Sequence, residues 1–250
     1  MTRNQHIFSK TISMDMDKMK RLKQYTNFLV LGRSGYGLNR AYIEPNLLTF
    51  SHDMLFVERN SQLREKYQEK LENNGYNVFV ITGKEAADFN QWADIVESVV
   101  SETGKVAIFM ELSKEVDSAF YEMLLKKLID AKTKDNSRYL HVYLNDIFSR
   151  FCLGQLSTMI QVSVRYNVGY SIVAGNVDEI ITSCEEEYIS EAILSVCSVI
   201  VLQGDFGQHC GLIYQALGID NPGKWNQPND KCLVGIGAGR VTVDDKYGVS

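Results

Sequence analysis

A glycine-rich stretch near the start of the chain has the residue types and spacing of a phosphate-binding loop. Against the pattern G-x-x-x-x-G-K-[ST], Gly32 and Gly37 take the two glycine positions. A working loop also uses a lysine to contact the β- and γ-phosphates and a hydroxyl to hold Mg²⁺, but Leu38 and Asn39 stand there. The stretch therefore predicts the backbone of a nucleotide site without its charge. The nucleotide-binding candidates are Gly32, Arg33, Ser34, Gly35, Tyr36, Gly37, Leu38 and Asn39.

The missing lysine leaves two interpretations of this loop open. A turn kept for packing, without a ligand, is favoured over ATP hydrolysis because a neutral side chain cannot replace the charge of lysine. Backbone N–H groups at the start of a helix still attract anions. The alternative is a nucleotide-binding loop in which Arg33 or Arg40 supplies the positive charge from a shifted position.

Two carboxylates follow apolar runs and are the candidate catalytic residues. Glu58 ends the run from Asp53, and Asp146 follows the run 139–144. Ligands of open α/β sheets bind at the carboxyl ends of strands, although a solvated carboxylate is the commoner finding there. The five cysteines and four histidines are scattered without the spacing of a metal site. We therefore expect no metal and no cofactor, except ATP with Mg²⁺ in the alternative interpretation.

Two other enzyme classes fit the same stretch less well. A dinucleotide site would place an acid about twenty residues beyond the loop, where Glu58 stands, but G-x-G-x-x-G read from Gly35 meets Arg40 at its third glycine. A serine-hydrolase turn, G-x-S-x-G, would need a final glycine where Tyr36 stands. Both remain minority interpretations.

The start of the chain is basic, whereas the remainder is acidic. Residues 1–40 hold eight Lys/Arg against two Asp, although the whole chain has a net charge of −5. This bias favours either a solvated arm or contact with DNA phosphates. The candidate DNA-binding residues are Lys18, Lys20, Arg21 and Lys23.

Composition and length indicate a folded domain. The 250 residues are 45% hydrophobic and 23% charged, which is typical of globular proteins. No apolar run reaches membrane-spanning length and the start has no secretory signal, so we expect a cytoplasmic protein unless a partner recruits it to the membrane. We divide the chain into a basic arm (1–24), a main domain (25–221) and a tail (222–250) packed on that domain.

Apolar strands alternate with amphipathic helices along the main domain. This order predicts an α/β fold, with a mostly parallel sheet of about seven strands and helices on both faces. The helix after the glycine-rich loop should end before Pro45, and the helix 116–131 should bury Phe120, Met123 and Leu124. The expected strands are 28–32, 53–58, 77–81, 106–110, 139–144, 170–174 and 198–202, and the other expected helices are 62–74, 86–102, 153–166, 185–194 and 206–217. A hairpin is expected in the tail at 231–236 and 240–243.

Short motifs follow the glycine-rich loop in a fixed order, with Pro-Asn-Leu at 45–47 and Gly-Tyr-x-Val at 75–78. This order resembles the motor domain of type IV secretion coupling proteins, the TraG/TraD-type conjugative DNA-transfer ATPases, in which the loop is followed by a K-P-N-L motif. The T-D-P-K-G-E-L, L-D-E-F and S-I-I-L-Q-S motifs fall on 57–63, 144–147 and 171–176. The resemblance implies a RecA-like P-loop NTPase fold.

The departures from this family fall on positions that carry its chemistry. They are Leu38 for lysine, Asn39 for the hydroxyl, Glu58 and Asn145 for aspartates, and Gly175 for a phosphate-sensing glutamine. The all-helical insertion of the family is also missing. The resemblance therefore implies a non-hydrolysing accessory subunit that docks with an active coupling ATPase, relaxosome proteins or DNA, and that could form homo-oligomers. The alternative is a working ATPase that uses Arg33 or Arg40.

Overall fold

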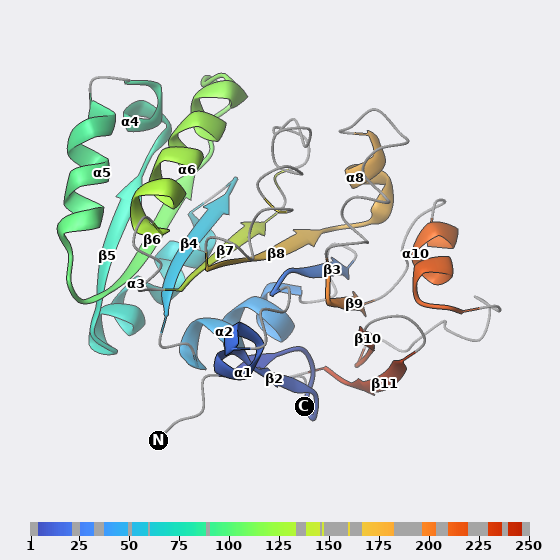
Figure 1. The fold of residues 1–250 in the computed structure, drawn as a ribbon. Coiled ribbons are helices and arrows are strands. Elements are labelled where there is room, and N and C mark those ends of the chain that lie inside the picture. The colour runs from blue at the N-terminus through green and yellow to red at the C-terminus, as the bar shows by residue number, and fades with distance from the viewer. Residues whose placement is uncertain are drawn as a thin grey trace. The chain divides into compact units, whose positions relative to one another are not determined.

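The computed structural model divides the chain into two compact units. The residues it describes are 5–21, 26–32, 38–49, 52–59, 61–88, 91–133, 139–145, 147, 160, 167–182, 197–203, 210–219, 230–236 and 240–246. Unit 1 consists of Met1–Phe50 and Ser171–Ser250, and unit 2 consists of Ser51–Tyr170. Each unit combines strands of a mostly parallel sheet with helices (Figure 1). The seven strands expected from the sequence are confirmed as β3 to β9.

Unit 2 is built on four parallel strands in the order β7-β4-β6-β5. All six residues of β4 are buried, as are the middle five of β6. These strands correspond to continuous apolar runs in the sequence, which is typical of a strand covered on both faces. The bounds are β4 Asp53–Glu58, β5 Tyr76–Ile81, β6 Lys105–Glu111 and β7 Leu140–Asn145.

Helix α3 (Gln62–Asn73) joins β4 to β5 and follows its sequence pattern closely. Leu63, Tyr67 and Leu71 recur every four residues and are all buried, so one stripe of the helix packs into the core. Gly75 has a φ of +78° directly after the helix, a conformation that glycine adopts without a steric penalty. The prediction for this segment is confirmed.

The prediction of a single helix over 86–102 is wrong, because the structure has two helices in this region. Helix α4 (Gly83–Ala87) begins earlier, where the Glu85 carboxylate accepts hydrogen bonds from both the N–H and the hydroxyl of Thr82, each at 2.6 Å. Asp88 then has extended backbone, and α5 (Trp92–Ser101) starts afresh. A capping interaction and one extended residue thus override the apolar periodicity.

Helix α6 (Ser118–Thr133) forms where expected but buries a different face. Leu124 is buried as predicted, whereas the exposed fraction is 37% for Phe120 and 49% for Met123. Tyr121 and Leu125 are buried instead. Because apolar residues cover most of the helix circumference, periodicity alone could not decide which stripe faces the sheet.

Unit 1 contains strands in the order β11-β10-β9-β3-β8, and Ser171–Ala174 are the part of β8 that belongs to it. The strand β3 (Phe28–Gly32) pairs in parallel with β8 (Val168–Ala174) and with β9 (Val199–Gln203). The expected terminal hairpin is present as the antiparallel pair β10 (Lys231–Ile236) and β11 (Val241–Asp245). After the N-terminal segment, the described helical segments of this unit are η1 (Asn39–Ile43), α2 (Glu44–Thr49), α8 (Val177–Thr182) and α10 (Cys210–Ala216).

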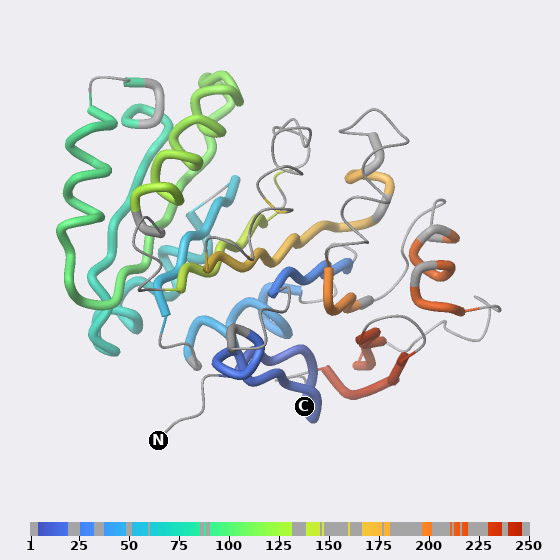
Figure 2. Tube along the Cα trace, in the orientation of Figure 1, coloured from blue at the N-terminus to red at the C-terminus, as the bar shows by residue number. Residues whose placement is uncertain are grey.

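The N-terminal segment of unit 1 has a defined fold. Strands β1 (Gln5–Ile7) and β2 (Ser13–Asp15) form a hairpin that leads into α1 (Met16–Arg21). Phe8 and Met16 are fully buried. The hairpin lies beside β11, because the Lys10 N–H donates to the Asp245 carbonyl at 2.9 Å (Figure 2).

The described part of the chain contains no helix that is both long and apolar enough to span a membrane. The helices expected over 153–166 and 185–194 lie almost wholly outside the described residues.

Candidate functional site

The glycine-rich loop starts at the carboxyl end of β3 in unit 1. Leu31 pairs with Ala174 of β8, and Gly32 pairs with Gln203 of β9. The loop therefore begins where the carboxyl ends of three parallel strands meet, which is the usual ligand edge of an α/β sheet. Arg33 to Gly37 lie outside the described residues, whereas Leu38 and Asn39 follow the loop as partly exposed residues.

The helical segment after the loop differs from the expectation at Pro45. A single π-helical turn, η1, leads directly into α2, and Glu44 keeps a right-handed helical conformation although a proline follows it. Pro45 occupies the first turn of α2, where its missing N–H costs nothing. The prediction that the helix ends before Pro45 is therefore wrong, and the exposed side chain of Arg40 lies within η1.

The Pro-Asn motif after the loop has a structural role in this chain. The Asn46 side-chain amide donates to the carbonyls of Ile7 and Tyr42, and its oxygen accepts from the Ile7 N–H, each at 2.7 Å. The Tyr42 hydroxyl lies 2.7 Å from both the His6 Nε2 and the Ser171 hydroxyl. These buried groups connect β1, η1, α2 and β8, so the motif fixes the elements that carry the loop.

The Glu179 carboxylate lies against Gly175, the position at which the similar sequence motif has a glutamine. The Gly175 N–H donates to the Glu179 carboxylate at 3.1 Å, and the Asn176 side chain contacts the same carboxylate at 3.3 Å. A Cβ atom on Gly175 would lie only 2.7 Å from Glu179 Oε1. The sequence motif gave no signal for Glu179, because its contact depends on the turn between β8 and α8.

In unit 2, polar residues gather at the carboxyl ends of three parallel strands. Glu58 ends β4, and its register partners are Glu111 at the end of β6 and Asn145 at the end of β7. The exposed fraction of Glu58 is 1%. Asp146, the other candidate acid, lies outside the described residues. The parallel register therefore adds Glu111 to this group, a residue that the motif comparison did not identify.

The Glu58 carboxylate faces the start of helix α3. Its oxygens accept hydrogen bonds from the N–H groups of Leu63 at 3.3 Å and Arg64 at 3.4 Å. Burial raises the pKa of Glu58 to about 7, and the charge of Glu111 adds to the rise, whereas these N–H groups and the Arg64 charge oppose it. The neutral form of this side chain is therefore favoured more than that of an ordinary glutamate.

Arg64 balances the second carboxylate of this edge. Its Nε atom donates to Glu111 Oε1 in a partly buried ion pair. Among the described residues of this edge, Asn145 is neutral and burial favours the neutral form of Glu58, so these two offer little negative charge to a divalent cation. Within the described ranges, no group of three or more His, Cys, Asp or Glu side chains is arranged to hold a metal ion.

The basic candidates lie on or after α1. Lys18 is exposed on this helix, and its N–H donates to the Asp15 carboxylate at 3.0 Å. Lys20 and Arg21 belong to the same helix, and Lys23 lies outside the described residues. Lys18 is thus the one candidate of the four whose side chain is described, and one exposed lysine does not define a nucleic-acid surface. DNA binding stays a prediction.

Comparison with known proteins gives matches to solved structures alone. No protein-family model and no curated protein match the sequence. VirB4 of Thermoanaerobacter pseudethanolicus superposes with a TM-score of 0.68 at 9% identity, over 99% of this chain and 97% of that chain. The bacterial conjugative coupling protein TrwBdeltaN70, in its unbound form, gives 0.62 at 10% identity over 98% and 88%. B204, the DNA-packaging ATPase of Sulfolobus Turreted Icosahedral Virus, gives 0.60 at 12% identity over 90% and 99%.

These similarities extend over nearly the whole chain. Together with the parallel strands and the loop position after β3, they show that the chain has the mixed α/β fold of P-loop NTPases, as the sequence predicted.

Proposed function

We propose that this chain is a non-hydrolysing accessory subunit of a conjugative or type IV secretion machinery. The observation that carries the proposal is the pair Leu38 and Asn39, which follow the loop in a chain whose fold resembles TrwBdeltaN70 and VirB4. The partners would be an active coupling ATPase or relaxosome proteins, and such a partner would bring the chain to the inner face of the membrane.

The loss of the loop lysine argues against ATP hydrolysis on physical grounds. A hydrogen bond to a charged group contributes about 1.5–3 kcal/mol to stability, and phosphoryl transfer depends on cations that neutralise the developing charge. Leu38 supplies neither a donor nor a charge. Asn39 offers a neutral amide where the pattern has a hydroxyl that holds Mg²⁺.

The strand ends of unit 2 support the same proposal. Asn145 stands at a position where the related motif has an acid, and the pKa of Glu58 is about 7. Acids that position Mg²⁺ and water must be ionised, because a protonated or amide side chain binds a divalent cation weakly. The substitutions at this edge and after the loop would thus both weaken the binding of Mg²⁺ that ATP hydrolysis requires.

Calorimetry with ATP and Mg²⁺ tests the proposal. We expect no heat of binding for the parent chain and measurable binding for the double variant Leu38→Lys, Asn39→Thr, because the loop backbone would regain its cation and hydroxyl. The matched control Leu38→Met, Asn39→Val changes the same positions without adding charge, and it should show no heat of ATP binding. Micromolar binding or ATP turnover by the parent chain would overturn the proposal.

A nucleotide-binding switch is the second candidate function, and one observation favours it. Arg40 is exposed on η1, two positions beyond Leu38. If this guanidinium or that of Arg33 replaced the lysine, the parent chain would bind ATP. Arg40→Gln or Arg33→Gln should then weaken binding at least tenfold, whereas Arg59→Gln, an exposed arginine of unit 2, should not.

Docking with an active coupling ATPase has its own test. We expect the chain to co-elute in size-exclusion chromatography with a purified coupling ATPase of the same conjugative system. Elution as a separate monomer at micromolar concentrations of both proteins would contradict the accessory role.

A further inference from the structure

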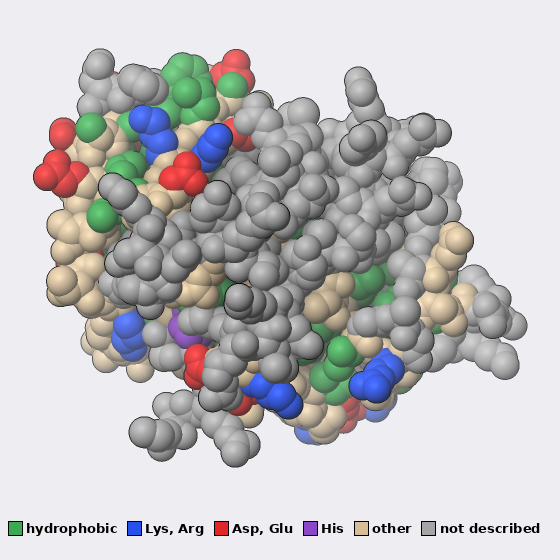
Figure 3. Space-filling model, in the orientation of Figure 1, with side chains coloured by type: hydrophobic (Ala, Val, Ile, Leu, Met, Phe, Trp, Pro, Cys, Tyr) green, Lys and Arg blue, Asp and Glu red, His purple; other side chains and the backbone are tan. Residues whose placement is uncertain are grey.

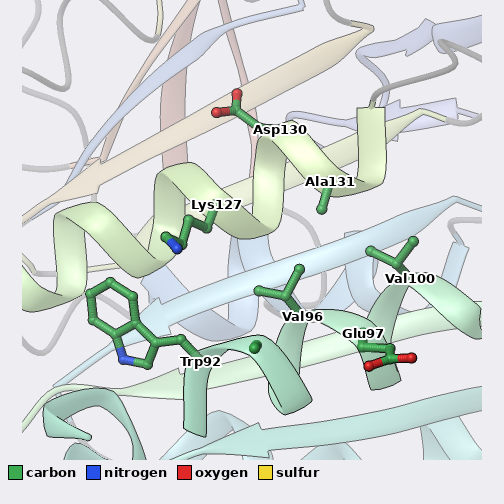
Figure 4. A pocket seen from close by; sticks show the side chains of 8 residues that line it. Trp92, Val96, Glu97, Val100, Lys127, Asp130 and Ala131 are labelled. Carbon is green, nitrogen blue, oxygen red and sulfur yellow. The ribbon is translucent and has the colours of Figure 1, made fainter. Parts of the chain in front are cut away.

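A groove runs between α5 and α6 on the surface of unit 2. It has a volume of about 620 Å³, and both helices contribute to its walls. Figure 4 shows Val96 and Val100 of α5 pointing toward α6, and Ala131 of α6 pointing toward α5. The residues that line the groove are Trp92, Ala93, Val96, Glu97, Val100, Lys127, Asp130 and Ala131.

The floor of this groove is apolar and continues along α6. Val100 is 44% exposed, and Met123, one turn before Lys127, is 49% exposed. Trp92 closes one end, where the Phe120 ring packs edge-on against it at 6.0 Å and Lys127 Nζ lies 5.7 Å from its ring centroid. On the face in Figure 3, hydrophobic side chains over α5 and α6 lie exposed among charged ones. A groove with an apolar floor is the kind of surface into which an amphipathic helix lays its apolar face.

Carboxylates flank this apolar floor on both sides. Glu97 comes from the α5 wall and Asp130 from the α6 wall, and both are exposed. Asp94 adds a further exposed carboxylate to α5. The lysine that lines the groove, Lys127, lies over the indole of Trp92 and therefore at one end. The groove lining has two carboxylates and one lysine, so an occupant with an apolar face and basic flanks matches it better than nucleic acid or anionic lipid would.

We propose that the α5–α6 groove binds a basic amphipathic helix of a partner protein. Helix α5 has ten residues and is about 15 Å long, so the groove fits roughly three turns of a helix. Apolar side chains at i, i+3 or i+4, and i+7 of the partner would contact Val96, Val100 and Met123, while flanking Lys or Arg residues meet Glu97 and Asp130. The apolar contacts supply affinity and the charges select the partner. This proposal does not depend on nucleotide binding.

Fluorescence anisotropy with a designed probe tests this proposal. The probe is a labelled 16-residue helical peptide with a leucine stripe and lysines on both flanks, and its control carries glutamates in place of the lysines. We expect the basic peptide to bind the full chain at least tenfold more tightly than the acidic one. Glu97→Gln with Asp130→Asn should weaken binding at least fivefold at low salt, and Val100→Asp should weaken it more.

Matched controls separate the groove from general charge attraction. Glu69 and Glu72 are exposed on α3 of the same unit, and Glu69→Gln with Glu72→Gln should leave binding unchanged. An equal loss of peptide affinity in this control and in the groove variant would overturn the proposal. A basic peptide that does not bind the parent chain would overturn it too. The neutral Glu97→Gln, Asp130→Asn pair keeps the apolar packing, so the test holds even if Val100→Asp unfolds. Sedimentation showing a dimer that Val100→Asp dissociates would assign the groove to a second copy and overturn it too.

Discussion

Each unit holds a carboxylate that accepts hydrogen bonds, but the pKa values of the two carboxylates are shifted in opposite directions. In unit 1, Asp244 Oδ2 accepts from the Ser9 hydroxyl at 2.6 Å, and from the Thr11 hydroxyl and N–H at 2.7 and 2.8 Å. In unit 2, Glu58 has two longer bonds, at 3.3 and 3.4 Å, and a negative neighbour in Glu111. Burial acts to raise the pKa of Asp244 too, but its donors outweigh burial and bring the pKa to about 2, whereas that of Glu58 is about 7.

The difference shows what a buried or half-buried carboxylate needs in order to stay charged. Short bonds from hydroxyl and N–H groups replace the water lost by Asp244. At Glu58 the donors are too distant to offset nearly complete burial, so the neutral form is favoured. Asp244 is therefore a charged hydrogen-bond acceptor that connects the N-terminal hairpin to β11, while burial favours the neutral form of Glu58.

The largest expected effect comes from Glu58→Gln, which removes the titrating proton. A carboxyl whose pKa rises from 4.5 to about 7 on folding stabilises the native state below pH 4.5 and loses that contribution as the pH rises to 7. The difference corresponds to about 3 kcal/mol, at 1.36 kcal/mol per pH unit. The variant should therefore match the parent chain at pH 4.5 and exceed its free energy of unfolding by about 3 kcal/mol at pH 8, as measured by urea denaturation.

The quantity that tests this prediction is the difference between the variant and the parent. Burial also lowers the pKa of His141 in unit 2 to about 3, so both proteins lose stability as the pH falls below 6.5. That loss cancels in the difference. A difference that does not change between pH 4.5 and pH 8 would show that Glu58 has an ordinary pKa.

Asp244→Asn should have a smaller effect of opposite pH dependence. A pKa lowered from 3.8 to about 2 contributes stability above pH 3.8 that is lost as the pH falls to 2. We expect the variant to be less stable by about 1 kcal/mol at pH 7, after discounting for partial exposure, and equal to the parent at pH 2. Asp230→Asn, an exposed residue of the same unit, is the control. If both variants lose the same free energy of unfolding at pH 7, the hydrogen bonds from Ser9 and Thr11 do not stabilise the charge of Asp244.

Arg64→Met tests how much the charge of Arg64 lowers the pKa of Glu58 in unit 2. Removing the guanidinium leaves Glu111 without its ion pair and should cost about 1 kcal/mol at pH 8. It should also raise the pKa of Glu58 further, because the positive charge of Arg64 lowers that pKa in the parent chain. The pH at which Glu58 titrates can be followed by carboxyl NMR. An unchanged titration would mean that Arg64 and Glu58 are not coupled.

The smallest expected effect is that of Lys10→Ala, between the two residues, Ser9 and Thr11, that donate hydrogen bonds to Asp244. Its ammonium lies 3.4 Å from an Asp245 carboxylate, and the two side chains are 64% and 37% exposed. Solvent and salt screen such a pair, so the urea midpoint should not change measurably. A clear drop in the midpoint that disappears in high salt would show that the hairpin depends on this surface pair.

Much of the fold was predictable because its determinants are local. The apolar runs of β4 and β6, the four-residue spacing of Leu63, Tyr67 and Leu71, and the turn at Gly75 each express backbone sterics or burial within one short segment. The same local logic failed at Pro45, where a π-helical turn allowed a new helix to start, and at 86–102, where a cap divided one helix into two.

The sequence by itself determined that a glycine-rich loop follows a buried strand and that Leu38 and Asn39 replace the residues of its chemistry. Only the tertiary structure decided that Asn46 holds Ile7, that Glu111 lies beside Glu58, and that Met123 stays exposed. The reason is distance along the chain. Asn46 bonds a residue 39 positions away and Arg64 bonds one 47 positions away, so strand register and packing set these contacts, and no local pattern encodes them.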